Sequence, residues 1–303
     1  MVDAFITSLI NAAKNDESIV LLTGDLGYGV VTRFEKEFPN RFFNCGVAEQ
    51  NMIGVAAGLA SEGKKVFVYS IGNFVTQRVL EHLRNDVCFM NLDVNIVAMG
   101  AGLEYGQLGF SHHTTEDLAC MRACPNFSIY SPATAKECEY SMQKMLNSSS
   151  PTYLRINKVG ARLKETEVNM LNKVFGSGDI AIFATGTIVA EAVEAAKTLA
   201  KDNIDVAVYS CPVVKGLGVK EKIKAELEKY KLVISLEEHS KIGGFGSSIS
   251  GIIATENNMP RLVIMGIDDK FLDTVGDRNY LRHCYNIDSC AIIEKIKGEI
   301  NGN

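Results

Sequence analysis

One acidic residue stands where an extended segment gives way to a helix rich in glycine and alanine. It is Glu49, in the run CGVAEQN at residues 45–51. A carboxylate at such a junction faces burial, where it can hold a proton or a charge against a bound molecule. The helix dipole alone also favours an acid in the first helical turn. Spacing by itself leaves both interpretations open.

Three other side chains have types suited to chemistry. His112 carries an imidazole, which can move protons near neutral pH. Phe74 stands beside a strand end, where an aromatic ring is more often part of the core but can also stack on a flat ligand. Asp25, in LLTGDLGYG, is of the type that satisfies backbone N–H groups in a turn. Each of these patterns admits a structural as well as a functional interpretation.

The eight cysteines are scattered, and none forms the CxxC pair of zinc or redox sites. We expect reduced and mostly buried thiols. Cys120 and Cys124 would share a helix face, which alone is a very weak indication of metal binding. No metal ligands are predicted in this chain.

The positions of these residues depend on a regular scaffold. Short apolar runs alternate with amphipathic stretches, which is the pattern of a parallel sheet covered by helices. Residues 48–62 are expected to form a helix that starts next to Glu49. Residues 1–160 are predicted to be one α/β domain, with strands at Ile19–Thr23, Lys65–Tyr69, Val94–Met99, Ser128–Ser131 and Thr152–Ile156.

A charged and polar stretch, residues 161–178, is predicted to be an interdomain linker. After it the alternation resumes, which predicts a second and smaller α/β domain over residues 179–303. The fold class is therefore α/β, with two consecutive three-layer domains and mostly parallel sheets. The expected strands of the second domain are Ile180–Ala184, Val206–Tyr209, Leu232–Leu236 and Leu262–Met265, and its helices are residues 188–201, 219–229 and 245–256.

Composition excludes several classes of partner. The net charge is −5, and no basic block or basic and aromatic stripe runs along the chain, so nucleic acid is not expected as a partner. The apolar runs are far shorter than the roughly 20 residues that span a bilayer. The first ten residues, MVDAFITSLI, have no basic stretch ahead of an apolar region. We therefore expect a cytoplasmic protein without a membrane partner.

Several separated motifs resemble one enzyme family in the same order. The segments GVAEQNMIGVAAGLASEGKKVFVYS, NFVTQRV, GFSHHTTEDLACMRACPNFSIYSPA and PTYLRINK are similar to the pyrimidine-binding domain of transketolases and 1-deoxyxylulose-5-phosphate synthases. The segments DIAIFATGT and SLEEHSKIGGFGSSIS resemble the C-terminal domain of the same enzymes. The resemblance covers essentially the whole chain. It implies a thiamine-diphosphate-binding pyrimidine domain followed by a transketolase C-terminal domain.

The resemblance implies thiamine diphosphate as cofactor and Glu49 as the catalytic residue that activates it. In the family, the Glu of the AEQ motif hydrogen-bonds the pyrimidine N1′ atom. A carboxyl group buried against an apolar ring keeps its proton to a higher pH and can donate it. The cofactor then removes its own C2 proton and acts as an electron sink, chemistry that belongs to the cofactor rather than to the protein.

Other positions are carried over from the family motifs. Phe74 corresponds to the ring that stacks on the aminopyrimidine, and Gln77 and Arg78, one turn further on, also line the cofactor pocket. Asp25 lies in a loop near the same ring, and its role as a turn residue stays open. His112 matches the His of the GPTH motif, which contacts the reacting oxygens of the substrate. His112 is thus expected to be both catalytic and substrate-binding.

The diphosphate half of the family's cofactor site is missing from this chain. That half needs a GDG motif followed some thirty residues later by Asn, and the nearest string, GDLG at residues 24–27, belongs to the other domain. A companion N-terminal subunit should supply the diphosphate-binding domain together with Mg²⁺ or Ca²⁺. We expect a hetero-oligomer, of α2β2 composition.

The substrate-facing positions depart from those of ordinary transketolases. Leu108 stands where they carry the Asp that recognises a substrate hydroxyl. Gly100 and Gly29 replace a His and a Ser that bind the sugar phosphate, and Lys158, preceded by Arg155, stands near the usual Arg. Lysine meets a phosphate as a point charge without the bidentate fork of arginine. Acceptor and phosphate recognition are therefore expected to differ.

These features together predict the small subunit of a thiamine-diphosphate-dependent transketolase. It would transfer a two-carbon ketol unit from a ketose donor to an aldehyde-type sugar acceptor. A second interpretation is the β subunit of a 2-oxoacid dehydrogenase, which shares the two domains and the Glu. A third is a binding or scaffold protein that has kept the fold and lost catalysis.

Overall fold

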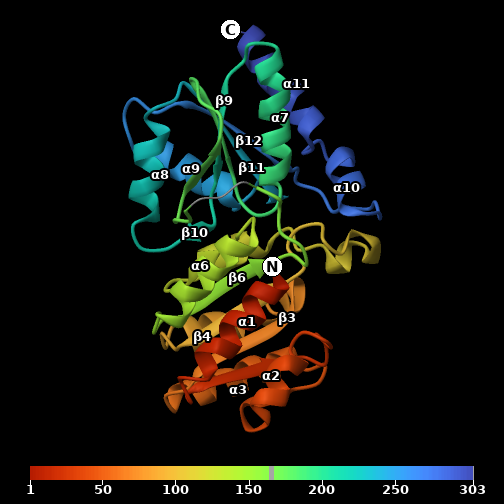
Figure 1. The fold of residues 1–303 in the computed structure, drawn as a ribbon, viewed down its shortest axis with the longest axis vertical. Helices are drawn as coiled ribbons and strands as arrows, with labels where there is room; N and C mark the ends of the chain where they lie inside the picture. The colour runs from red at the N-terminus through yellow and green to blue at the C-terminus, as the bar shows by residue number, and fades with distance from the viewer. Residues whose placement is uncertain (164–166, 303) are drawn as a thin grey trace.

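The computed structural model describes residues 1–163 and 167–302. Two α/β units lie one above the other, with the N-terminus near their junction and the C-terminus at the far end of the second unit (Figure 1). The first is built on a seven-stranded sheet and the second on a five-stranded sheet. Both sheets are mostly parallel, and the expected fold class is confirmed.

The first sheet has the strand order β10-β5-β6-β4-β3-β1-β2. The central strands are fully buried because helices cover both faces, as a parallel sheet requires. Their register sets neighbours such as Leu21 opposite Phe67 and Val97 opposite Leu154. The strands are β1 (Ile19–Thr23), β2 (Phe42–Asn44), β3 (Lys65–Ile71), β4 (Val94–Met99), β5 (Ser128–Tyr130), β6 (Thr152–Ile156) and β10 (Val213–Lys215).

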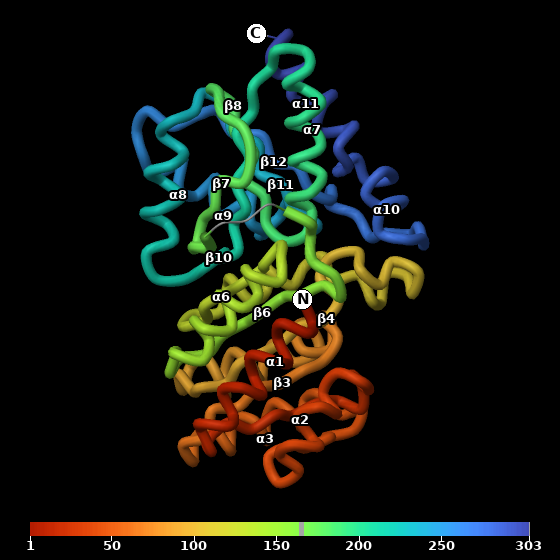
Figure 2. The backbone as a smooth tube through the Cα atoms, viewed as in Figure 1, coloured from red at the N-terminus to blue at the C-terminus, as the bar shows by residue number. Residues whose placement is uncertain are grey.

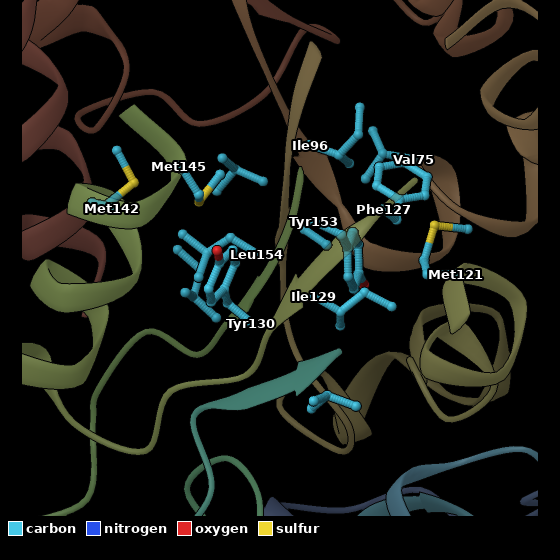
Figure 3. Packing of buried hydrophobic residues seen from close by; sticks show 14 of the residues in the cluster. Val75, Ile96, Met121, Phe127, Ile129, Tyr130, Met142, Met145, Tyr153 and Leu154 are labelled. Carbon is cyan, nitrogen blue, oxygen red and sulfur yellow. The ribbon is translucent and has the colours of Figure 1, made fainter. Parts of the chain in front are cut away.

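Side chains that alternate along β5 and β6 form the two halves of the first core. Figure 3 shows Ile129 and Tyr153 on one side of the strands with Met121, and Tyr130 and Leu154 on the other with the two methionines of α6. This alternation is the two-residue period of a strand. The helices of this unit are α1 (Val2–Ala13), α2 (Thr32–Glu37), α3 (Glu49–Ser61), α4 (Leu80–His82), α5 (Asp117–Ala123) and α6 (Ala135–Leu146).

Short helical turns carry the loops at the strand ends. They are the 3₁₀ turns η1 (Pro39–Arg41), η2 (Gly72–Phe74), η3 (Gln77–Val79), η5 (Gly106–Leu108) and η6 (Phe110–His112), and the π-helical segment η4 (Leu83–Cys88).

The second sheet has the order β12-β11-β8-β9-β7, with β7 antiparallel to β9. Its helices α7 and α11 pack against each other, and α8 and α9 lie on the opposite side (Figure 1). Its strands are β7 (Asn172–Phe175), β8 (Ile180–Ala184), β9 (Val206–Ser210), β11 (Leu232–Ser240) and β12 (Arg261–Ile267). Its helices are α7 (Val189–Lys201), α8 (Val219–Leu227), α9 (Phe245–Ile253), α10 (Arg278–Cys284) and α11 (Ser289–Asn301).

The stretch 161–178 differs from the expected linker. Residues 164–166 lie outside the described residues, but Asn172–Phe175 form β7 and pair with β9 through Asn172 opposite Ser210. The polar composition of this edge strand disguised it, because its side chains are exposed or half buried. The second sheet therefore starts inside the stretch that was expected to be irregular.

A short strand from the second half of the chain completes the first sheet. β10 pairs antiparallel with β5, with Val213 opposite Tyr130, and the Ser131 N–H donates to the Pro212 carbonyl at 2.8 Å. The tube in Figure 2 places β10 where the two units meet, close to α6. The two units thus share a sheet edge. Within the described residues, no helix is both long and apolar enough to cross a bilayer.

Candidate active site

Loops that follow the carboxyl ends of β1, β3 and β4 carry most of the candidate residues. These three strands are adjacent and parallel, so their ends meet at one edge of the sheet. In open α/β sheets this edge is where ligands bind. The loops after β1, β3 and β4 hold Asp25, Phe74 and Tyr105 respectively, and α3 begins beside them at Glu49.

Glu49 is the first residue of α3, and only 3% of it is exposed. Its Oε2 accepts from Arg78 Nη1 at 2.7 Å, which gives the buried carboxylate a charged partner. The other oxygen, Oε1, lies at 3.4 Å from the point where a side chain on Gly24 would begin. Because residue 24 is glycine, Oε1 is left open toward the loop after β1.

Arg78 also lies over the ring of Phe74, with its guanidinium carbon 4.4 Å from the ring centroid. The Arg78 carbonyl accepts from Gln50 Nε2 at 3.3 Å, so this segment is tied to α3. The side chain of Arg78 is 44% exposed. A flat ligand that stacks on Phe74 uses the opposite face of the ring or displaces this half-exposed side chain.

His112 is the last residue of η6, and its ring lies beside those of Phe74 and Tyr105. Its ring centroid is 5.5 Å from that of Phe74 and 6.5 Å from that of Tyr105, both in edge-on geometry. Its Nδ1 and the Ser111 hydroxyl are 3.0 Å apart. The sequence motifs therefore converge in space, since Arg78 contacts both Glu49 and Phe74, and Phe74 lies beside His112.

Asp25 is exposed and adopts a left-handed backbone, with φ of 38°. Its Oδ1 accepts from the Tyr28 hydroxyl at 2.7 Å and from Asn44 Nδ2 at 3.0 Å, and these hydrogen bonds lower the pKa of Asp25. Asn44 in turn accepts from the Gly46 N–H. Asp25 thus links the loop after β1 to the loop that leads into α3, through side chains that the sequence had not singled out.

Gln77 does not point toward Glu49. Its Nε2 donates to Glu116 Oε2 at 3.1 Å, on the side of a cavity of about 390 Å³. Phe271 and Leu272 of the second domain line the same cavity, and the rings of Phe110 and Phe271 are 6.3 Å apart. The second domain therefore contributes an apolar wall next to the loop that carries His112.

The predicted substrate positions fall into two groups. Gly29 is exposed with nothing within 4 Å of its missing side chain, and Leu108 is 57% exposed. In contrast, Gly100 is buried and packs directly against the ring of Tyr105. Lys158 lies beside the same ring, with Nζ 5.0 Å from its centroid. Gly100 and Lys158 therefore lie near His112, by way of Tyr105.

Arg155 is not available to a substrate, which corrects the sequence-based assignment. It is 2% exposed, and its Nε donates to Asp117 Oδ2 at 2.8 Å. Its Nη2 donates to the carbonyls of Thr114 and Glu238 at 2.8 and 2.9 Å. The motif position had suggested a phosphate ligand, but the side chain holds the two domains together from inside.

The junction of the two domains contains further buried charges. Glu237 accepts from the Phe245 and Gly246 N–H groups at the start of α9, and burial raises its pKa to about 7. His239 is also fully buried, and burial lowers its pKa to about 4. Its neutral ring accepts from the Ala119 N–H at Nε2 and donates from Nδ1 to the Ser240 carbonyl.

Two stacked α/β units, with a buried carboxylate and a row of aromatic rings at the strand ends of the first, define a two-domain α/β enzyme subunit of the doubly wound class. A family model for the transketolase pyrimidine binding domain matches residues 1–162, and one for the transketolase C-terminal domain matches residues 172–271. The chain belongs to the transketolase family, as the C-terminal subunit of a split transketolase-like enzyme.

Individual relatives are similar over nearly their whole length. A putative transketolase C-terminal section from Methanocaldococcus jannaschii is 35% identical, covering 97% of this chain and 94% of the relative. One of the subunits of apulose-4-phosphate transketolase from Actinobacillus succinogenes is 32% identical, covering 97% and 96%. The solved structure of a split-gene transketolase, described as an inactive β4 tetramer, has a TM-score of 0.86 at 30% identity and covers 97% of this chain and 96% of that one.

The family depends on thiamine diphosphate, and the residues at this site fit one end of it. A buried carboxyl group with one open oxygen can share a proton with a ring nitrogen, and the half-buried ring of Phe74 matches a flat heteroaromatic. In residues 1–163 and 167–302, no group of three His, Cys, Asp or Glu side chains is arranged to hold a metal ion. The fit of this chain is thus to the ring of the cofactor.

Proposed function

We propose that this chain is the small subunit of a transketolase that transfers a two-carbon ketol unit from a ketose to an aldehyde-type sugar acceptor. The observation that carries the proposal is the row of contacts that links Glu49 to Phe74 through Arg78, and Phe74 to His112. When bound, thiamine diphosphate supplies a carbon nucleophile and an electron sink for breaking and forming the carbon–carbon bond. The roles below belong to the residues of this chain.

Glu49 is the residue that contacts the aminopyrimidine nitrogen and exchanges a proton with it. Its burial and its place at the start of α3 fix the carboxylate, and Oε1 is the oxygen open to a ring nitrogen. Phe74 orients the ring by stacking, which leaves few alternative poses for a flat ligand. Arg78 holds Oε2 so that the two oxygens have different partners. Orientation of this kind supplies much of the rate that a protein adds to a cofactor.

His112 is the residue that exchanges protons with the substrate oxygens. It lies beside Phe74, and its Nδ1 already has a hydroxyl partner in Ser111. The opposite nitrogen, Nε2, is therefore the one that faces a substrate. Leu108 provides no hydrogen bond where ordinary transketolases carry Asp, and we infer that the acceptor differs from theirs.

A companion subunit completes the site in this proposal. It supplies the diphosphate-binding domain and Mg²⁺ or Ca²⁺, and the complex has α2β2 composition. Support comes from the relative in Actinobacillus succinogenes, which is itself one subunit of a transketolase, and from the similar structure of a split-gene transketolase. We place the complex in the cytoplasm.

The test is reconstitution with the companion subunit, thiamine diphosphate and Mg²⁺, followed by assays of a ketose donor with a panel of aldehydes. We expect cofactor-dependent ketol transfer by the wild-type complex. Glu49→Ala should lower kcat by at least about 10²-fold, the lower end of the contribution of a positioned proton-transfer group. Glu62→Ala, at the exposed far end of α3, is the matched control and should leave the rate unchanged.

Other outcomes favour the other interpretations. Oxidative decarboxylation of a 2-oxoacid by the same complex would identify a dehydrogenase subunit. Biological activity that survives Glu49→Ala would identify a scaffold protein. Absence of cofactor-dependent turnover across a broad panel of ketoses and aldehydes would contradict the transketolase proposal itself.

A further inference from the structure

Gly100 has a backbone conformation and an environment that exclude every other residue. Its φ is 91°, in the left-handed region, which side chains rarely adopt. A Cβ built on it would lie 2.3 Å from Cε2 of Tyr105. The Tyr105 ring therefore fills the volume that a side chain at position 100 would need. The presence of glycine at 100 and the place of Tyr105 depend on each other.

The loop that carries Tyr105 is held rigidly. Leu103 is fully buried in the core of the second domain, and its N–H donates to Glu238 Oε2 at 3.4 Å. Gly102 and Thr114 form an isolated antiparallel bridge, which ties this loop to the segment that follows His112. Tyr105 is thus preorganised next to His112 and needs no ordering when a substrate arrives.

Tyr105 and Lys158 present hydrogen-bond donors and one positive charge. The Tyr105 hydroxyl has no hydrogen-bond partner in the part of the chain that the structure describes. Burial raises the pKa of Tyr105, so the hydroxyl keeps its proton and remains a donor. The ammonium of Lys158 lies over the ring, with no carboxylate partner within the described ranges.

Glu104, the carboxylate that the Lys158 backbone contacts, is already satisfied by other donors. Glu104 accepts from Asn157 Nδ2 at 2.9 Å and from Arg278 Nη1 at 2.7 Å, and the Lys158 backbone N–H reaches its other oxygen at 3.3 Å. Arg278 balances the charge of Glu104. The charge of Lys158 is therefore left for a ligand, and the chemistry of the two free groups matches an oxyanion that accepts hydrogen bonds and donates none.

We propose that Tyr105 is a specificity-determining residue that binds, together with Lys158, an anionic group on the sugar substrate. The inference rests on the proposed function, because it takes the space beside His112 to be the substrate site. The Tyr105 hydroxyl donates to an oxygen of the anionic group, and Lys158 supplies the charge. The Tyr105 ring occupies the space that a side chain at position 100 would fill, and it closes this end of the site.

The test compares fructose 6-phosphate with fructose, titrated calorimetrically into the complex of this chain and its companion. The wild-type complex should bind the phosphorylated sugar at least about tenfold more tightly. Tyr105→Phe keeps the ring and removes one hydrogen bond to a charged group, so it should lose about tenfold in affinity for fructose 6-phosphate. Its affinity for fructose should stay unchanged.

A second variant tests the dependence on Gly100. Gly100→Ala should displace the Tyr105 ring and reproduce the loss seen for Tyr105→Phe. Gly63→Ala is the control, because Gly63 has φ of 82°, with nothing within 4 Å, and carries the same backbone strain without touching a ring. Gly63→Ala should bind both sugars as the wild type does.

Three outcomes would overturn the inference: equal binding of the two sugars by the wild type, no change in Tyr105→Phe, or an equal loss for both sugars, which is the mark of a structural role. These measurements do not require turnover. A complex that shows the expected binding pattern without ketol transfer would contradict the proposed function and leave the role of Tyr105 supported.

Discussion

At the scale of single residues, Arg155 shows that a motif position does not determine function: the motif suggested phosphate binding, but the side chain is buried. The guanidinium has lost its water and keeps its charge because Asp117 and two carbonyls replace the solvent. Asp117 Oδ2 also accepts from the Tyr153 hydroxyl at 2.6 Å. Removal of the arginine would leave a fully buried carboxylate without a cation, which is more costly than the pair itself is favourable.

Arg155→Met should therefore destabilise the protein by about 3–5 kcal/mol, measured by denaturant unfolding. The double variant Asp117→Leu/Arg155→Met removes both charges and should recover a large part of that loss. A loss below about 1 kcal/mol for the single variant, accompanied by a change in KM for a phosphorylated substrate, would restore Arg155 to the substrate site.

Two buried groups at the domain junction titrate with opposite consequences for stability. Between pH 4.5 and 7, folded Glu237 holds a proton that its unfolded form has lost, so stability falls as pH rises. Between pH 4 and 6.5, the unfolded chain protonates His239 and the folded chain does not, so stability rises with pH. The two slopes cancel over the window from pH 4.5 to 6.5.

Glu237→Gln should expose the contribution of His239. The free energy of unfolding of this variant should rise across pH 4.5 to 6.5 more steeply than that of the wild type, by about 1.4 kcal/mol per pH unit. Denaturant melts at several pH values measure it, and the difference between the two proteins removes the contribution of all other groups. Parallel pH profiles would contradict the buried titration of Glu237.

The sequence predicted those site residues that belong to a recognisable motif. It could not predict residues whose place in the site depends on contacts with segments distant in the chain. Glu49, Phe74 and His112 were proposed from their motifs, and the structure brings them together. Tyr105 was missed because its place depends on the backbone of Gly100 and on a loop anchored in the other domain. No local pattern marks such a ring.

At the scale of elements, β10 is the piece that joins the two domains. Its pairing with β5 is short, and Lys215 at its end extends the contact by donating to the carbonyls of Arg122 and Cys124 at 3.1 and 2.5 Å. These carbonyls lie at the carboxyl end of α5, where a cation is favoured by the helix dipole. Arg122 in turn donates to the carbonyls of Gly243 and Gly244, so each domain holds the other.

Lys215→Met should keep the strand and remove its two charged hydrogen bonds. We expect a loss of about 2 kcal/mol in the free energy of unfolding and faster amide exchange in the last turn of α5. Lys220→Met, on the exposed surface of neighbouring α8, is the control and should change stability by less than about 0.5 kcal/mol. Equal effects of the two substitutions would show that β10 needs no anchor.

Hydrophobic periodicity predicted the long elements and failed for short edge strands. Buried strands such as β1 (IVLLT) and β8 (IAIFA) contain apolar runs that identify them from the sequence alone. β2, β7 and β10 have three or four residues each, and their backbone groups pair with partners distant in the chain. These segments are strands because they pair with distant strands and not because of their composition. No local sequence pattern could therefore predict them.

At the scale of the whole molecule, the candidate site lies on an open edge of the first domain. Tyr28 and Val47 belong to loops near Glu49, and Phe43 belongs to the edge strand β2; they are 72, 79 and 44% exposed. Large apolar side chains that gather at a functional edge are typical of a surface that another subunit covers. In the proposed function, this chain offers the ring-binding residues there, and the companion subunit supplies the charged groups that hold the diphosphate.

If the two subunits each hold one end of thiamine diphosphate, the affinity for the cofactor should depend on the companion subunit. Thiamine diphosphate titrated into this chain alone should bind at least about 100-fold more weakly than into the complex with Mg²⁺, because ring contacts act without the charge contacts that hold the diphosphate. For this chain alone, thiamine and thiamine diphosphate should bind alike, whereas the complex should prefer the diphosphate strongly. Native mass measurement should show the α2β2 assembly. Tight, diphosphate-dependent binding by this chain alone would contradict the split site.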